Sequence, residues 1–82
     1  MGELTLEQLR QIFARSFAAT PGPWRSFVEG RDHTSGDSFV RTGGEDIYLS
    51  GASTADQDFI AGARQDIPTL VREIARLRGW QL

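Results

Sequence analysis

The sequence predicts a small α+β domain with an N-terminal helix, a three-stranded antiparallel β-meander and a C-terminal kinked helix or helix pair. Three observations support this. Apolar residues follow helical spacing near the N-terminus, short β-forming segments alternate with turn formers in the middle, and a second helical stripe runs through residues 54–77. At 82 residues, the chain is expected to form a single domain, 1–82, with a small core.

The first helix is predicted to begin after Thr5, because Gln8 three residues later completes the pattern of a capping box. Apolar residues then recur at helical spacing, namely Leu6, Leu9, Ile12, Phe13 and Phe17. The helix is expected to end near Ala18, since Thr20 precedes a proline and proline disfavours a helical backbone in the preceding residue.

The segment Pro21, Gly22, Pro23 predicts a rigid corner, because two prolines fix backbone angles on either side of a permissive glycine. The corner is expected to direct the chain from the helix into the sheet. We interpret these three residues as structural, together with Trp24, which we expect to be buried beneath the turn.

Three short strands are expected at Trp24–Val28, Phe39–Thr42 and Ile47–Leu49. The segment Gly30–Asp37 has no periodicity and is rich in turn-forming residues, so it is predicted to be a hairpin loop. Gly43–Asp46 is predicted to be the second turn, which completes the meander.

The last helix is predicted to open with a second capping box, Ser53 and Asp56, and to stop at Gly79. Unbroken to Arg78 it would be roughly 36 Å long, whereas a compact domain of this size is only about 30 Å across. Pro68, which we interpret as structural, lacks a backbone donor and collides with the preceding turn. We therefore expect either one kinked helix or two helices that meet at a corner.

Apolar residues in this last segment recur at alternating steps of three and four, at Ile60, Ala63, Ile67, Leu70, Ile74 and Leu77. This spacing fits both a coiled-coil seam and a helix that packs on its own domain. Pro68 interrupts the stripe and Phe59, Val71 and Ala75 widen it, which favours packing within the chain. The alternative is that the stripe forms a seam with a partner or in a homodimer. Packing within the chain and such a seam are compatible if a small core leaves part of the stripe uncovered.

The charge distribution suggests two surfaces for binding another protein. Residues 29–58 hold seven acidic residues against two arginines, a net of −5, whereas both ends are mildly basic. The candidate residues are Glu29, Asp32, Asp37, Glu45 and Asp46 on the acidic side, and Arg64, Arg72, Arg76 and Trp80 on the last helix. The weakly clustered basic residues argue against direct nucleic-acid binding.

No chemistry-bearing motif emerges from the sequence. The chain has no cysteine, the acidic residues lack EF-hand spacing, and the glycine-rich segments match no phosphate-binding pattern. We interpret His33, the single histidine, as a solvated loop residue. Catalytic residues, metals and cofactors are therefore not expected, and neither is enzymatic activity. The sequence also shows neither a signal peptide nor an apolar run of membrane-spanning length, so we expect a cytoplasmic protein without membrane contact.

Several short motifs resemble the Ead/Ea22-like family of small phage and prophage accessory proteins. The similarity covers roughly residues 5–78 and is carried by Ala19–Trp24, Ala55-Asp56, Phe59-Ile60-Ala61, Ala63-Arg64, Asp66-Ile67-Pro68, Leu70, Glu73-Ile74 and Leu77-Arg78. The resemblance implies a small non-enzymatic factor of a phage or mobile element that binds a host or phage protein. It transfers no catalytic residues.

Taken together, these features predict a protein–protein interaction module. Two alternatives follow from the same features. The first is an acidic inhibitor of a host defence or transcription nucleoprotein complex that mimics nucleic acid. The second is a homo-oligomeric structural module, such as a homodimer, joined through the C-terminal helix.

Overall fold

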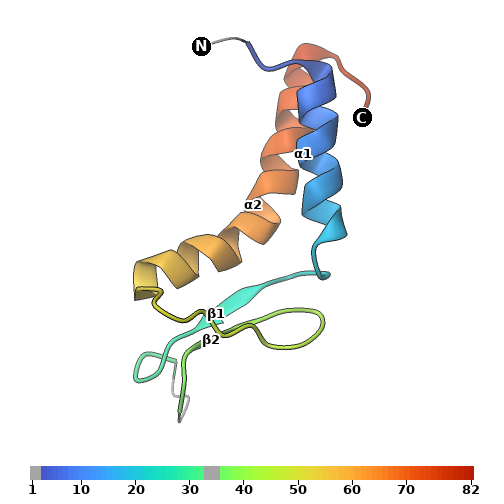
Figure 1. The fold of residues 1–82 in the computed structure, drawn as a ribbon. Coiled ribbons are helices and arrows are strands. Elements are labelled where there is room, and N and C mark those ends of the chain that lie inside the picture. Colours follow the sequence, from blue (N-terminus) through green and yellow to red (C-terminus); the bar gives the residue numbers. More distant parts are fainter. Residues whose placement is uncertain (1–2, 33–35) are drawn as a thin grey trace.

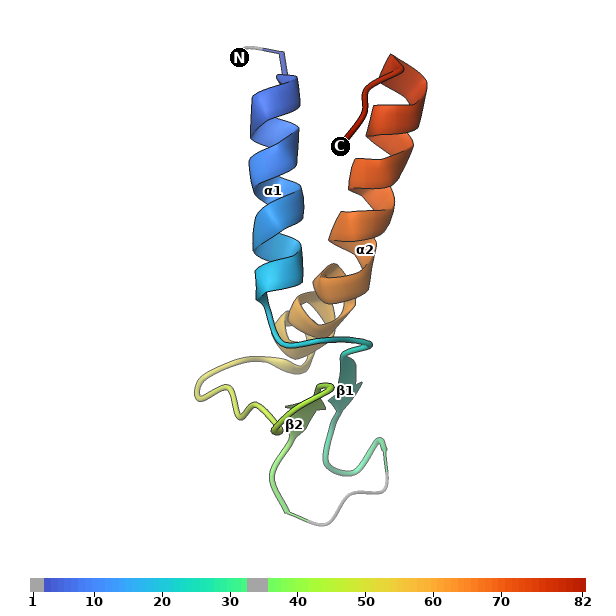
Figure 2. The same cartoon turned by 90° about the vertical axis from the view of Figure 1, so that its right-hand side faces the viewer.

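The computed structural model describes residues 3–32 and 36–82 and has an α+β fold with a two-stranded antiparallel sheet. The elements are α1 (Leu6–Ala18), β1 (Arg25–Phe27), β2 (Phe39–Arg41) and α2 (Thr54–Arg78). Helix α1 lies antiparallel beside the C-terminal half of α2, and the sheet lies against the N-terminal half of α2 (Figures 1 and 2). We call these two regions the helical end and the sheet end.

The molecule is elongated along α2, with extents of 47 × 27 × 18 Å. Its radius of gyration is 15.3 Å, against about 12 Å for a compact domain of this length. Helix α2 runs without interruption past Pro68 and bends about halfway along (Figure 1). The structure therefore has one kinked helix rather than a pair. The molecule is longer than the roughly 30 Å of a compact domain of this size, because the two ends pack on different halves of one long helix.

The predicted helix boundaries are confirmed. The Thr5 hydroxyl accepts a hydrogen bond from the Gln8 N–H at 3.1 Å, and the Gln8 side chain accepts one from the Thr5 N–H at 2.9 Å. Ser53 and Asp56 form the same reciprocal pair at the start of α2. Gly79 adopts the left-handed conformation (φ 67°) and ends the helix.

The sheet is smaller than predicted. Strands β1 and β2 pair in the register Arg25↔Arg41, Ser26↔Val40 and Phe27↔Phe39. The expected third strand at Ile47–Leu49 was wrong: in the described part of the chain it is reduced to one bridge, in which Val40 and Ile47 exchange backbone hydrogen bonds of 2.8 and 2.9 Å. After Ile47 the chain turns away toward α2, so Tyr48 is 61% exposed.

The corner before the sheet packs against the turn that follows β2. The Gly43 N–H donates to the Pro21 carbonyl at 2.7 Å, and a Cβ at Gly43 would lie 2.6 Å from that oxygen. A side chain is therefore excluded at this position. Trp24 is only half-buried, contrary to the expectation of burial, and its Nε1–H donates to the Thr20 carbonyl at 2.9 Å.

The core consists of two small groups of side chains. At the helical end, Leu9 of α1 packs against Val71 and Ala75 of α2. At the sheet end, Val40 and Ala61 are buried. Because a core of this size covers only part of α2, much of the helix surface stays exposed.

Candidate protein-binding surface

Helix α2 presents two different faces. The residues that are buried against the rest of the chain are Gln57, Ala61, Pro68, Val71 and Ala75. The apolar stripe singled out in the sequence, Ile60, Ala63, Ile67, Leu70, Ile74 and Leu77, is centred about 110° away around the helix. We call it the α2 stripe.

Most of the α2 stripe is uncovered. Leu77 is 69% exposed, Leu70 is 56% exposed, and Ile60 and Ile67 are each 37% exposed. Ile74 alone among the stripe residues contacts the described core of the helical end. The expectation that the stripe packs within the chain was therefore wrong for most of its residues, because Val71, Ala75 and Pro68 face α1 and the corner instead.

An apolar groove continues the stripe toward α1. It has a volume of about 360 Å³ and lies between Ile12 and Ser16 of α1, Trp24, and Ala63 and Ile67 of α2. The N-terminal part of the stripe thus forms one wall of a groove between two helices. Such a groove accommodates the side chains of a third helix that lies along it.

Two phenylalanine rings elsewhere, Phe17 and Phe27, have arginines beside them. Phe17 is 50% exposed, but the guanidinium groups of Arg64 and Arg72 each lie 5.6 Å from its ring centre. Phe27 has Arg25 and Arg41 at 5.0 and 4.7 Å. These distances fit cation–π contacts. Phe59, which lies beside the stripe on α2, is 76% exposed, and Leu70 shares a shallow hollow with Arg72 and Arg76.

The basic candidates of α2 and Trp80, which follows the end of the helix, do not form one patch. Arg64 donates to the Thr20 carbonyl at 3.1 Å, and Arg72 stacks on Phe13 and Phe17 of α1. Arg76 pairs with Glu73. Trp80 packs against the core of the helical end, with Arg78 at 5.1 Å from its ring. Arg64, Arg72 and Trp80 therefore contribute to internal packing.

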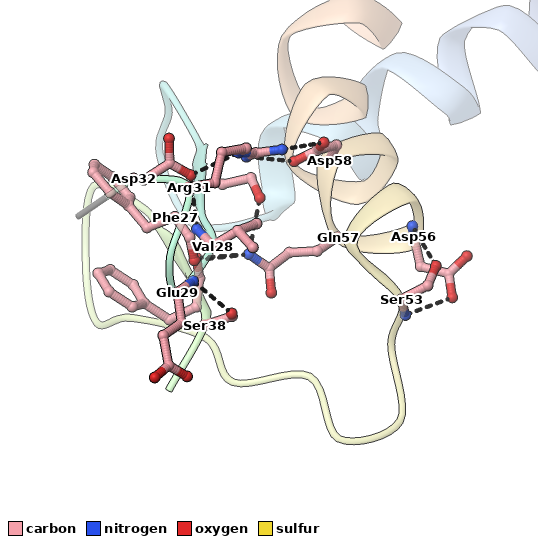
Figure 3. A network of polar contacts seen from close by, with 12 residues as sticks. Phe27, Val28, Glu29, Arg31, Asp32, Ser38, Ser53, Asp56, Gln57 and Asp58 are labelled. Carbon is pink, nitrogen blue, oxygen red and sulfur yellow. Dashed lines mark hydrogen bonds and ion pairs between the residues drawn. The ribbon is translucent and has the colours of Figure 1, made fainter. Parts of the chain in front are cut away.

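The acidic candidates are partly neutralised. Asp32 accepts hydrogen bonds from the Val28 N–H at 2.8 Å and from Arg31 at 2.9 Å, and the Val28 contact is the larger cause of its lowered pKa (Figure 3). Arg31 also makes a bidentate pair with Asp58 of α2, at 2.8 and 3.0 Å. This pair, with a smaller contribution from Ser26, lowers the pKa of Asp58 to about 2.

The other acidic candidates, Glu29, Asp37, Glu45 and Asp46, are exposed in the loops that flank the sheet. Arg25 and Arg41 are also exposed and lie opposite each other on the two strands. The sheet end therefore carries mixed charge rather than a continuous acidic face.

Two glutamines that sequence reasoning missed attach the sheet to α2. Gln57 is 4% exposed, and its Nε2 donates to Ser26 Oγ at 2.8 Å and to the Phe27 and Phe39 carbonyls at 3.1 Å (Figure 3). Gln65 accepts from the Trp24 N–H at 2.7 Å and donates to the Trp24 carbonyl at 3.1 Å. Their eight-residue spacing, two helical turns apart, was the available signal.

No protein family, curated protein or solved structure matches the chain. Within residues 3–32 and 36–82, no helix is both long enough and apolar enough to cross a membrane. The same residues hold no group of three or more His, Cys, Asp or Glu side chains placed to bind a metal ion. His33 lies outside the described residues.

Proposed function

We propose that the protein is a non-enzymatic protein-binding module that docks an amphipathic helix of its partner along the α2 stripe. The observation that carries the proposal is the exposure of Leu70 and Leu77 on a stripe of aliphatic residues that the fold leaves uncovered. Removing apolar surface from water contributes about 25 cal/mol per Å². Contiguous exposed apolar surface of this kind is typical of interaction sites.

The spacing of the stripe favours a helix as the occupant. Anchors at alternating three- and four-residue steps interlock with a facing helix whose apolar residues have the same spacing. The adjoining groove between Ile12 of α1 and Ile67 of α2 offers a second row of apolar contacts to that helix. A helix with a continuous apolar face is therefore the occupant that fits both features.

The geometry favours the α2 stripe over the acidic loops. Arg31 contacts the carboxylates of both Asp32 and Asp58, and Arg25 and Arg41 interrupt the negative charge of the sheet. An acidic inhibitor that mimics nucleic acid therefore has less support from the described residues. In line with the resemblance to phage accessory proteins, the proposed partner is a protein of the phage or of its host, a class that includes a second copy of this chain.

Site-specific photo-crosslinking in cells tests the proposal. A photoreactive amino acid at Leu77 is expected to capture a protein through a segment with a continuous apolar helical face, identified by mass spectrometry. The matched control is the same amino acid at Tyr48, which is similarly exposed but lies on a loop of the sheet end. Equal capture at the two positions, or capture of nucleic acid, would overturn the proposal.

A further inference from the structure

We infer that the helix docked on the α2 stripe is α2 of a second copy of this chain, and that the two helices run parallel. This inference rests on the proposed function and names its partner. The seam consists of Ile67, Leu70, Ile74 and Leu77 in the C-terminal half of α2.

The residue types in the seam indicate how many helices the coiled coil contains. In heptad terms Ile67 and Ile74 occupy a positions, and Leu70 and Leu77 occupy d positions. Isoleucine at a with leucine at d is the combination that favours parallel two-stranded coiled coils. The seam is therefore suited to one further helix of the same sequence.

The charges beside the seam specify the direction. Glu73 occupies a g position and Arg78 the following e position, and both side chains are exposed. In a parallel pair, Glu73 of each copy lies opposite Arg78 of the other, which gives two symmetric attractive contacts. Within one copy Glu73 forms an ion pair with Arg76, one turn along the helix, and both side chains are exposed.

An antiparallel pair places like charges together. With the same apolar residues in contact, Glu73 would face Glu73 of the second copy. Like charges in these flanking positions disfavour an arrangement. The charge pattern therefore selects the parallel dimer over the antiparallel one.

The surface area of the chain is consistent with a missing partner. A folded monomer of this mass exposes about 4,900 Å², whereas this chain exposes 5852 Å². The excess of about 1,000 Å² is close to the roughly 800 Å² that each partner buries in a standard interface. The elongated shape of the molecule accounts for part of this surplus, and a dimer contact along α2 would cover a further part.

The bend in α2 is compatible with this contact. Pro68 is buried on the packed face, so its ring does not obstruct the seam. The four seam residues span Ile67 to Leu77, toward the end of the helix that lies beside α1 (Figure 2). Ile60 and Ala63 line the groove together with Ile67, which is where the groove and the seam meet.

The absence of cysteine from the sequence allows a clean crosslinking test of direction. In a parallel dimer the two residues at position 77 face each other, so Leu77→Cys is expected to form a disulfide-linked dimer under mild oxidation. In an antiparallel dimer the two positions are separated by about 15 Å along the axis. The matched control is Arg76→Cys, the adjacent exposed residue that points away from the seam. Equal crosslinking of both variants would refute the parallel arrangement.

Sedimentation equilibrium tests the seam itself. The wild-type chain is expected to dimerise, and Leu70→Glu is expected to weaken dimerisation at least about tenfold, equivalent to 1.4 kcal/mol. Tyr48→Glu is the control and is expected to leave it unchanged. Circular dichroism verifies that both variants are folded, because both positions are exposed in the single chain.

Charge reversal tests the dimer without changing the apolar residues of its seam. Glu73→Arg is expected to weaken the dimer, since it places arginine opposite Arg78, and adding Arg78→Glu is expected to restore it. A chain that is monomeric at its highest soluble concentration would refute the dimer. If photo-crosslinking at position 77 then still captured a different protein, the proposed function would stand, whereas no capture there would refute both.

Discussion

The two ends of the molecule are held together by different chemistry. At the helical end, α1 and α2 meet through the aliphatic side chains of Leu9, Val71 and Ala75. At the sheet end, the side-chain amide of Gln57 binds the backbone of both strands, and that of Gln65 binds the backbone of Trp24 just before β1. A sheet of two three-residue strands has little apolar surface to bury, so hydrogen bonds from the helix fix its position. One helix therefore serves both ends with one face and leaves its stripe available.

The largest expected effect is on the apolar packing of the helical end. Leu9 is 1% exposed, so Leu9→Ala removes most of a buried side chain and leaves a cavity. We expect a loss of about 3 kcal/mol in the free energy of unfolding, measured by urea denaturation. Leu82→Ala, at a position that is 44% exposed, is the control and is expected to change stability by less than about 0.5 kcal/mol.

The next effect is on the polar attachment of the sheet end. Gln57→Leu preserves the approximate volume of the side chain but removes the donor that serves the Phe27 and Phe39 carbonyls. We expect a loss of about 2 kcal/mol, the cost of leaving buried acceptors unpaired, again from urea denaturation. Gln11→Leu on the exposed face of α1 is the control. An equal result for the two glutamines would show that the amide contacts do not hold the sheet.

A pair of glycine substitutions distinguishes the junction between the ends from the helix itself. Gly43→Ala forces a methyl group against the Pro21 carbonyl and is expected to cost about 1–3 kcal/mol. Gly62→Ala within α2 meets its nearest atom, Asp66 Oδ2, at an ordinary 3.5 Å. It is expected to stabilise the chain by about 0.5–1 kcal/mol, because alanine favours the helix. Melting temperatures that move in the same direction for both would contradict this reading of the junction.

The smallest effect concerns the ion pair that ties the loop after β1 to α2. Arg31, with Ser26, lowers the pKa of Asp58 to about 2, below its usual value near 4. The pair therefore contributes stability above about pH 4, and this contribution is lost as the pH falls through 2. The melting temperature of Asp58→Asn is expected to lie slightly below that of the wild type at pH 7, and the gap is expected to close as the pH falls from 4 to 2. A gap that widens in acid would exclude the pair as its cause.

Local signals in the sequence predicted the helix ends well. The capping boxes at Thr5 and Ser53 and the stop at Gly79 each depend on residues within one turn of each other. The identity of the packed face of α2 depends instead on which residues of α1 and the sheet come to lie against it. For that reason we expected the regular apolar stripe to face the core with Val71 and Ala75 at its margin, whereas the structure buries Val71 and Ala75 and exposes most of the stripe.

The same distinction explains the sheet and its attachment. Ile47–Leu49 has the composition of a strand, but a strand needs a partner along its length, and the chain turns toward α2 after a single bridge. Gln57 and Gln65 are unremarkable helix residues in sequence, because their partners lie 18 to 41 residues away. Contacts over such separations leave only a weak trace in one sequence.

The antiparallel arrangement of α1 and α2 also has a mechanical consequence. Helix α1 begins and α2 ends at the same end of the molecule, far from the sheet (Figure 1). A force that pulls these two helix ends apart acts across the interface and loads its contacts one turn at a time, among them the contact of Arg10 with the Gln81 carbonyl. Such peeling requires less force than sliding the helices along each other, in which all contacts resist at once. The helical end is therefore expected to unzip from its open side under low tension, with the sheet end the last part to feel the load.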